Sequence, residues 1–283
     1  MMKQKLILSI ILLASYISLF AQVSEGGGVY IQNNGKLINS IVRNNYASIG
    51  FGVAGTSGEV LNSNIIDNIY ISKAIMIPGD IYLNDGLVYS PEYNSNGELL
   101  PIPDSIKAKV MGVCFWSNAN NDFVNAQFWI VSVDEPASMP WGPGGDISTL
   151  FDYQNPALVI TDLDGKTNSS EIITGYGASA TVSNCAAKFC SQYGTPGTIG
   201  QWFLPSGGQM RELLRAMSVI NDVLNNLGKT PLKTSTEYWV SNEYGAWNGW
   251  SFSTIDGMTV TGSNTSKSSN CKVRPMIIVQ RNN

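Results

Sequence analysis

Aromatic side chains gather in one stretch near the C-terminal end of the chain, beside amide and carboxylate groups. The aromatic residues are Tyr238, Trp239, Tyr244, Trp247, Trp250 and Phe252. Trp and Tyr rings stack on sugar rings or anchor protein interfaces, and the neighbouring Asn242, Glu243 and Asn248 can hydrogen-bond hydroxyl groups. The stretch therefore predicts a site that binds a glycan or a protein.

A second interpretation applies to part of this stretch. Side chains alternate between the two faces of a strand, so Trp239, Trp250 and Phe252 can instead point inward as core. Tyr244, Trp247 and Asn248 fall in the turn between the strands and are the better exposed candidates. Trp141 opens a loop with three glycines, which has neither the lysine nor the helix of a phosphate-binding loop and is suited to line a groove. The predicted ligand-binding residues are Trp141, Asn242, Glu243, Tyr244, Trp247 and Asn248.

The segment Asp162–Asn168 begins like a calcium loop, because its alternate side chains carry oxygen ligands. Glu171 arrives too early to be the bidentate twelfth ligand of an EF-hand. A structural Asp-Gly turn is therefore favoured over a metal site. We predict no metal and no cofactor.

The chain has four cysteines, and an even number in an exported protein is typical of disulfides. Cys185 and Cys190 lie five positions apart on an expected helix, which puts them on different faces, so each would pair outside that helix. Free buried thiols are the alternative. The disulfide candidates are Cys114, Cys185, Cys190 and Cys271.

Several function classes are disfavoured by composition. The chain has no histidine, which removes the usual general base for a nucleophile and the commonest zinc ligand. We predict no catalytic residues and no enzyme activity. The net charge is −4 and no Lys/Arg cluster occurs, so nucleic acid is a poor partner. A polysaccharide lyase or hydrolase needs a long groove with paired carboxylates, and two coils with Asp67 do not provide it.

The first residues have the pattern of an export signal. Lys3 and Lys5 precede the apolar run Leu6–Phe20, which is short for a membrane span. We predict a signal peptide over residues 1–21 and no membrane span after its removal. The expected location is the cell surface or the extracellular medium, with the periplasm and a retained anchor as alternatives.

A repeat follows the signal. The segment Gly35–Asn45 aligns with Gly58–Asn68 at a spacing of 23 residues, with apolar positions between glycine and asparagine. Such a repeat is typical of one coil of a parallel β-helix, and the segment is similar to right-handed parallel β-helix proteins. We predict a short β-helix-like segment over residues 22–72. A pair of hairpins is the alternative.

Residues 73–283 have a different sequence pattern. Strand patterns flank the Asp85-Gly86 turn, and two helices are expected, over residues 178–190 and from Ser206 to Gly228. Four short strands joined by polar turns follow, the last of them from Cys271 to Val279. We therefore expect one α+β domain in which two helices pack on an antiparallel sheet.

Within this domain, three motifs carry a family resemblance: Trp202-Phe-Leu-Pro-Ser206, Ser235-Thr-Glu-Tyr-Trp-Val-Ser241 and Val273-Arg-Pro275. They resemble the C-terminal domain family of the Lcl bacterial collagen-like adhesin. The resemblance implies a C-type-lectin-like fold at the cell surface that attaches to glycans or proteins. It also implies a disulfide from Cys185 or Cys190 to Cys271. The chain has no collagen-like repeat and no Glu-Pro-Asn or Gln-Pro-Asp motif, so calcium-dependent sugar binding is not implied.

The sequence thus predicts an exported adhesion protein that recognises a glycan or a host or matrix protein through loops. A structural accessory or tip subunit of a surface assembly is the alternative, and a polysaccharide-active enzyme is the least favoured. The oligomeric state is left open.

Overall fold

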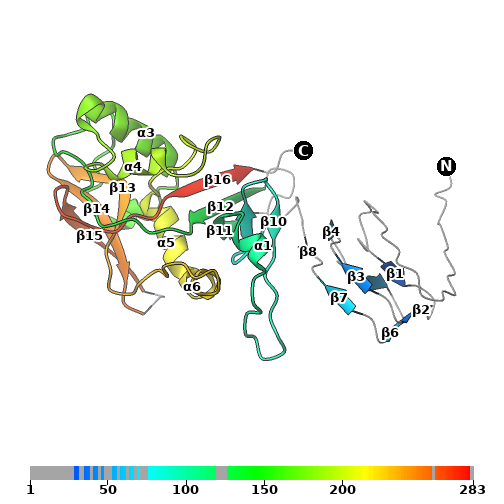
Figure 1. Ribbon diagram of the computed structural model, residues 1–283. Coiled ribbons are helices and arrows are strands. Elements are labelled where there is room, and N and C mark those ends of the chain that lie inside the picture. Colours follow the sequence, from blue (N-terminus) through cyan, green and yellow to red (C-terminus); the bar gives the residue numbers. More distant parts are fainter. Residues whose placement is uncertain are drawn as a thin grey trace, which may run out of the picture. The chain divides into compact units, whose positions relative to one another are not determined.

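The computed structural model divides the chain into two compact units, Met1–Ser72 and Lys73–Asn283 (Figure 1). It describes residues 76–118, 126–256 and 259–280, and in the first unit it describes only eight short strands between Val29 and Tyr70. The predicted signal peptide, residues 1–21, lies outside the described residues.

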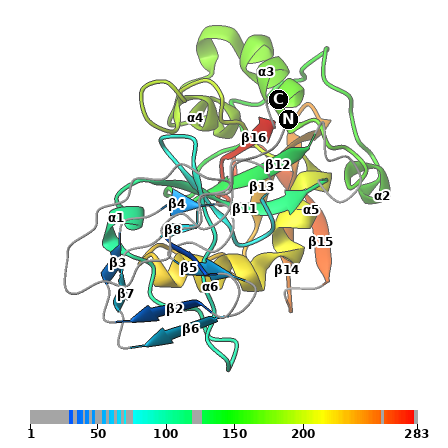
Figure 2. The ribbon, with the colours of Figure 1, turned by 90° about the vertical axis from the view of Figure 1, so that its right-hand side faces the viewer.

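The strands of the first unit pair in parallel, in four separate couples, and Figure 2 shows β2 beside β6. The partners lie 23 or 24 positions apart in the chain: Gly35 pairs with Gly58, and Val29 pairs with Val53. Parallel partners need a long connection, whereas a hairpin pairs its strands antiparallel. The couples are β1 (Val29–Ile31) with β5 (Val53–Gly55), β2 (Gly35–Ile38) with β6 (Gly58–Leu61), β3 (Ile41–Arg43) with β7 (Asn64–Ile66), and β4 (Tyr46–Ala47) with β8 (Ile69–Tyr70).

Two antiparallel sheets form the framework of the second unit. The larger has the order β10-β9-β11-β12-β16, and the smaller has the order β13-β14-β15. The long strands β11 and β12 are almost entirely buried and rich in β-branched and aromatic residues, as central strands require. The bounds are β9 (Ile81–Leu83), β10 (Val88–Tyr89), β11 (Val110–Ser117), β12 (Gln127–Ser132), β13 (Tyr238–Gly245), β14 (Asn248–Thr254), β15 (Val260–Ser266) and β16 (Met276–Gln280).

The helices of this unit are short. Ser206 and Gln209 form a capping box at the start of α5, in which each side chain satisfies a backbone N–H of the first turn. The predicted long helix from Ser206 to Gly228 is broken at Ala216 into α5 and α6. The helices are α1 (Asp104–Lys107), α2 (Pro156–Val159), α3 (Gly165–Tyr176), α4 (Ala186–Gln192), α5 (Gly207–Arg215) and α6 (Met217–Asn226), with a 3₁₀ turn, η1, over Gly177–Ser179.

The predicted fold class is wrong. We expected an α+β C-type-lectin-like domain of two helices on one antiparallel sheet, but two antiparallel sheets dominate and the helices are several and short. The expected helix over residues 178–190 is α-helical only in its second part, where α4 begins at Ala186. The last strand, β16, leaves its sequence neighbour β15 and pairs with β12. Strand patterns show which residues form strands but not which distant strand each one joins, and this is why the architecture was mispredicted.

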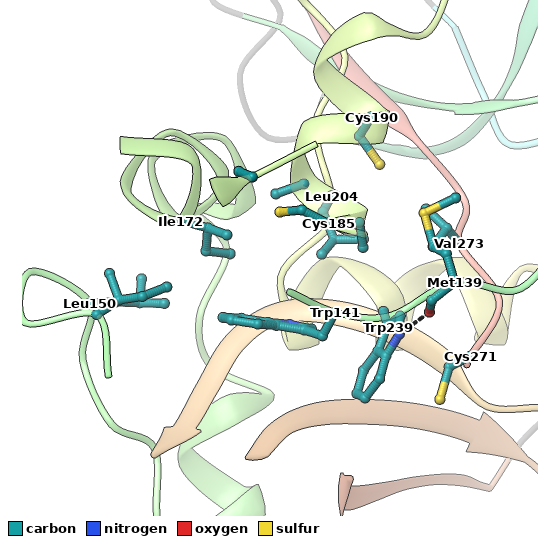
Figure 3. Packing of buried hydrophobic residues seen from close by; sticks show 14 residues of the cluster. Met139, Trp141, Leu150, Ile172, Cys185, Cys190, Leu204, Trp239, Cys271 and Val273 are labelled. Atoms are coloured by element: carbon teal, nitrogen blue, oxygen red, sulfur yellow. Dashed lines mark hydrogen bonds between the residues drawn. The ribbon is translucent and has the colours of Figure 1, made fainter. Parts of the chain in front are cut away.

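A buried cluster between the sheets and helices contains two wholly buried tryptophans, Trp141 and Trp239 (Figure 3). The Nε1–H of Trp239 donates to the backbone oxygen of Met139 at 2.8 Å, and that of Trp141 donates to the backbone oxygen of Val240 at 2.7 Å. Each large apolar ring is therefore buried with its polar atom satisfied. Among the described residues, no helix is long and apolar enough to cross a membrane.

Candidate functional site

The hairpin of β13 and β14 carries most of the predicted ligand-binding residues. The strands close at Gly245 and Asn248, so Ala246 and Trp247 form the turn. Trp247 is 72% exposed, and a Cβ added to Gly144 would lie only 3.3 Å from its ring. The indole therefore lies against the glycine-rich loop while most of its surface faces solvent.

Tyr244 and Asn248, on either side of this turn, are half-buried. The ring of Tyr244 meets Trp250 edge-on with 5.6 Å between centroids, and its backbone oxygen accepts a hydrogen bond from Gln154. Asn248 pairs with Ser266 of β15. Both residues thus flank the exposed indole from strand positions.

Asn242 is wholly buried, and both polar atoms of its side-chain amide form hydrogen bonds. Its Nδ2 donates to Oδ2 of Asp162 at 2.6 Å, and its Oδ1 accepts from the backbone N–H of Gly207 at 2.7 Å. Asn242 therefore connects β13 to the start of α5 and to the loop before α3.

Trp141 is likewise buried, at 0% exposure, rather than lining an open groove. Its loop needs glycine at several positions: Gly144 and Gly145 have φ of +88° and +93°, values that other L-residues rarely adopt. A Cβ on Gly142 would lie 2.4 Å from the ring of Tyr176. Two shallow pockets of the described residues, one beside Trp116 and one beside Phe189, include none of the predicted ligand-binding residues.

Glu243 and Lys267 form a buried ion pair beneath this loop, with side chains 0% and 1% exposed. The Lys267 ammonium also donates to the backbone oxygen of Gly145 at 2.7 Å and lies 4.8 Å from the centre of the Trp141 ring. The ring of Tyr176 lies 5.8 Å from the same nitrogen. Lys267 thus joins β13, the end of β15 and the glycine-rich loop.

Two exposed aspartates, Asp146 and Asp152, approach this pair. One carboxylate oxygen from each of them and one from Glu243 all lie within 4.8 Å of one another. Burial, with a smaller contribution from Asp152, raises the pKa of Glu243 to about 6, although Lys267 and the nearby Ile147 N–H act in the opposite direction. The Oε2 atom of Glu243 is buried and has no hydrogen-bond partner among the described residues.

Lys267, Asp146 and Asp152 were not singled out from the sequence. Lys267 lies in a polar run of Ser and Thr that is typical of a surface turn. Asp146 and Asp152 lie in a loop without periodicity, and only the fold brings them to Glu243. Two aspartates shortly after a glycine-rich loop were the one available signal.

The segment Asp162–Asn168 is a helix start. Asp164 caps α3 by accepting from the backbone N–H of Thr167, and the oxygens of Asp162 accept from Asn168, Asn242 and the backbone of Asp164. The hydrogen bonds of these two carboxylates hold the N-terminal end of α3 against β13.

All four cysteines lie in the described part of the chain, and each is a buried free thiol, so none of the anticipated disulfides is found. Burial raises the pKa of all four thiols, that of Cys271 to about 12. Cys185 and Cys190 belong to the same buried cluster, which Figure 3 shows.

No protein-family model matches this chain, and no curated protein matches it. One similar solved structure is a fimbrial protein from Bacteroides ovatus ATCC 8483. It has a TM-score of 0.51 and 13% sequence identity, with 80% of this chain and 52% of the other covered. The chain thus spans about half the length of that protein. The similarity concerns the fold, and it is a second finding against the predicted lectin-like class.

Proposed function

We propose that this chain is a structural accessory or tip subunit of a cell-surface assembly. The observation that carries the proposal is the similarity of fold to a fimbrial protein over 80% of the chain. The export pattern of the first residues, Lys3 and Lys5 before an apolar run, is in keeping with such a location.

The arrangement of the predicted ligand residues also favours a structural role over an open binding groove. Trp141, Asn242 and Glu243 are buried and engaged within the protein. The proposal includes no catalytic activity, since the chain has no histidine to act as a general base.

Fractionation of the native bacterium tests the proposal. An epitope tag after Asn283 would be followed through shearing of surface appendages, mild cross-linking and mass spectrometry. We expect the tagged chain in high-molecular-mass surface material, with defined protein partners. Recovery of the chain as a soluble monomer without partners, while a tagged known appendage subunit sediments normally, would contradict it.

One observation supports a second function, recognition of a glycan or protein ligand. The indole of Trp247 is 72% exposed on a tight turn, and such rings stack on sugars or serve as interface anchors. The mature protein would be screened against glycans and matrix proteins together with Trp247→Ala. Tyr93→Ala, which removes another exposed aromatic ring, is the matched control.

Loss of binding in the Trp247 variant and its retention in the Tyr93 variant would support recognition through this turn. Equal loss in both variants, or the lack of any ligand for the unaltered protein, would refute it. Because the first test measures assembly and this one measures ligand binding, each function can fail without the other.

A further inference from the structure

The cluster of Asp146, Asp152 and Glu243 is held in place by backbone contacts as well as by proximity. Asp152 forms a parallel β-bridge with Glu243, and the backbone N–H of Tyr153 donates to the backbone oxygen of Glu243 at 2.9 Å. Asp146 directly follows Gly145, whose oxygen accepts from Lys267. Backbone contacts therefore hold the three carboxylates near one another, Asp152 directly beside Glu243 and Asp146 through the neighbouring Gly145.

Glu243 has an acceptor that the protein leaves unused. Lys267 binds Oε1, while Oε2 is buried and makes no hydrogen bond with the described residues, although the backbone N–H of Ile147 lies near the carboxylate. A buried carboxylate oxygen without a partner is unfavourable and uncommon in folded proteins. The unused oxygen belongs to the buried member of the cluster, whose other two members are exposed to solvent and thus to dissolved ions.

The local charge also favours a cation. Three carboxylates against the single ammonium of Lys267 leave two negative charges in excess when all are ionised. The aromatic neighbours Trp141 and Tyr176 add no positive charge. One divalent ion would balance this excess.

The spacing and chemistry of the oxygens are compatible with a divalent ion. Calcium binds oxygen at about 2.3–2.6 Å, so ligands on opposite sides of it lie up to about 5 Å apart, whereas magnesium at about 2.0–2.1 Å allows only about 4 Å. Ligand atoms that lie within 4.8 Å of one another are within the reach of calcium. Calcium is favoured because it tolerates irregular and mixed coordination, whereas magnesium demands a near-ideal octahedron.

We propose that Asp146, Asp152 and Oε2 of Glu243 bind a calcium ion, with water completing the coordination. The ion links the glycine-rich loop, the segment before α2 and strand β13. Because the same loop lies against Trp247, calcium also stiffens the support of the exposed indole. This proposal stands apart from the proposed assembly role, since it concerns ion binding by the isolated chain.

Terbium luminescence and thermal unfolding of the full mature chain test the site. Terbium, a luminescent substitute for calcium, would be excited through the nearby tryptophans, and added CaCl₂ should displace it. Millimolar CaCl₂ should raise Tm by about 3 °C or more, and the same concentration of MgCl₂ should raise it much less.

Two variants locate the effect. Asp146→Asn and Asp152→Asn change exposed side chains, so both should fold, yet each should lose at least tenfold in calcium affinity and most of the Tm rise. Asp104→Asn alters an exposed aspartate of α1 outside the cluster and should behave as the unaltered chain does. A lack of terbium binding, an equal response to magnesium, or unchanged affinity in both cluster variants would overturn the proposal.

Discussion

Trp141 and Trp247 belong to one structural neighbourhood, since the first opens the glycine-rich loop and the second lies against it. Their exposures are 0% and 72%. Trp141 also packs against Gly249, where an added Cβ would lie 3.0 Å from its ring. The two rings therefore allow a direct test of which aromatic residues support the fold.

We expect Trp141→Ala to lower the free energy of unfolding by about 3–5 kcal/mol, because it leaves a cavity in a close-packed core. Trp247→Ala should change it by no more than about 0.5 kcal/mol, as exposed substitutions usually do. Urea unfolding followed by circular dichroism measures both. A large decrease in the free energy of unfolding of the Trp247 variant would show that the turn is part of the core.

The ionisation of Tyr238 should lower the free energy of unfolding at alkaline pH. Burial raises the pKa of this wholly buried tyrosine to about 12, and the charge of Glu135 adds to the effect, although the backbone N–H of Lys233 acts against it. An unfolded tyrosine ionises near pH 10. The contribution of Tyr238 to the free energy of unfolding is therefore fully present below about pH 10 and is lost as pH rises towards 12.

Urea midpoints measured from pH 9 to 12 should fall more steeply for the unaltered chain than for Tyr238→Phe. Lysines also lose protons in this range, but their contribution is common to both proteins and cancels in the comparison. Identical slopes would mean that Tyr238 ionises normally in the folded protein.

Residue environments in the hairpin show where sequence reasoning succeeds. Trp239, Trp250 and Phe252 are buried, as the inward-facing interpretation predicted. Asn242 and Glu243 are buried as well, although they are neighbours in the strand and strict alternation would expose one of the two. The ladder of β13 shifts register between Trp239 and Glu243, and both faces of the strand are covered, so the rule of alternating exposure fails there.

At the level of elements, the β11 and β12 ladder depends on a glycine. Gly112 pairs with Ser132 of β12, and an added Cβ would lie 2.5 Å from the backbone oxygen of Val131. A backbone atom cannot move aside as a flexible side chain can. The strands would have to separate locally to admit even a methyl group.

We expect Gly112→Ala to lower the free energy of unfolding by about 1–3 kcal/mol, the usual effect of overpacking. Gly245→Ala is the matched control, because a Cβ there meets nothing within 4 Å. Thermal unfolding of the two variants checks this. Equal behaviour would imply that the sheet relaxes around the added methyl group.

The helices differ in how well sequence reveals them. The apolar spacing of α5 and α6 predicts helix, although no Gly or Pro signals the break at Ala216. Helix α3 is not expected from the sequence, which predicts only an Asp-Gly turn within Asp162–Asn168, and only Gly165, Ser169 and Ile172 of this helix are buried. Its amphipathic pattern is weak, since Ile172 is the one large apolar side chain of this helix that is buried.

For the whole molecule, the second unit contains its own sheets, helices and buried clusters. We expect residues 73–283 expressed alone to fold and to unfold cooperatively, with a Tm within a few degrees of the full chain, because a core of this size supports an independent domain. Calorimetry of both proteins measures this. Failure of the shorter protein to fold would mean that the first unit is needed for its stability.

The pairing of distant strands limits prediction at this scale. The 23-residue repeat coincides with the register of β2 and β6, in which Gly35 pairs with Gly58. No repeat relates β12 to β16, which pair from Gln127 with Gln280 to Val131 with Met276 across more than a hundred residues. That contact depends on the packing of the entire unit, so local patterns do not reveal it.

The four buried thiols give this chain its own set of reporters of local opening. A thiol-reactive maleimide requires a thiolate, which both burial and the raised pKa values suppress in the folded state. Each cysteine is therefore labelled only when its surroundings transiently open. The separate labelling rates of the four cysteines would report which part of the domain opens first. Cys114 lies on β11, Cys185 and Cys190 lie at α4, and Cys271 lies ahead of β16.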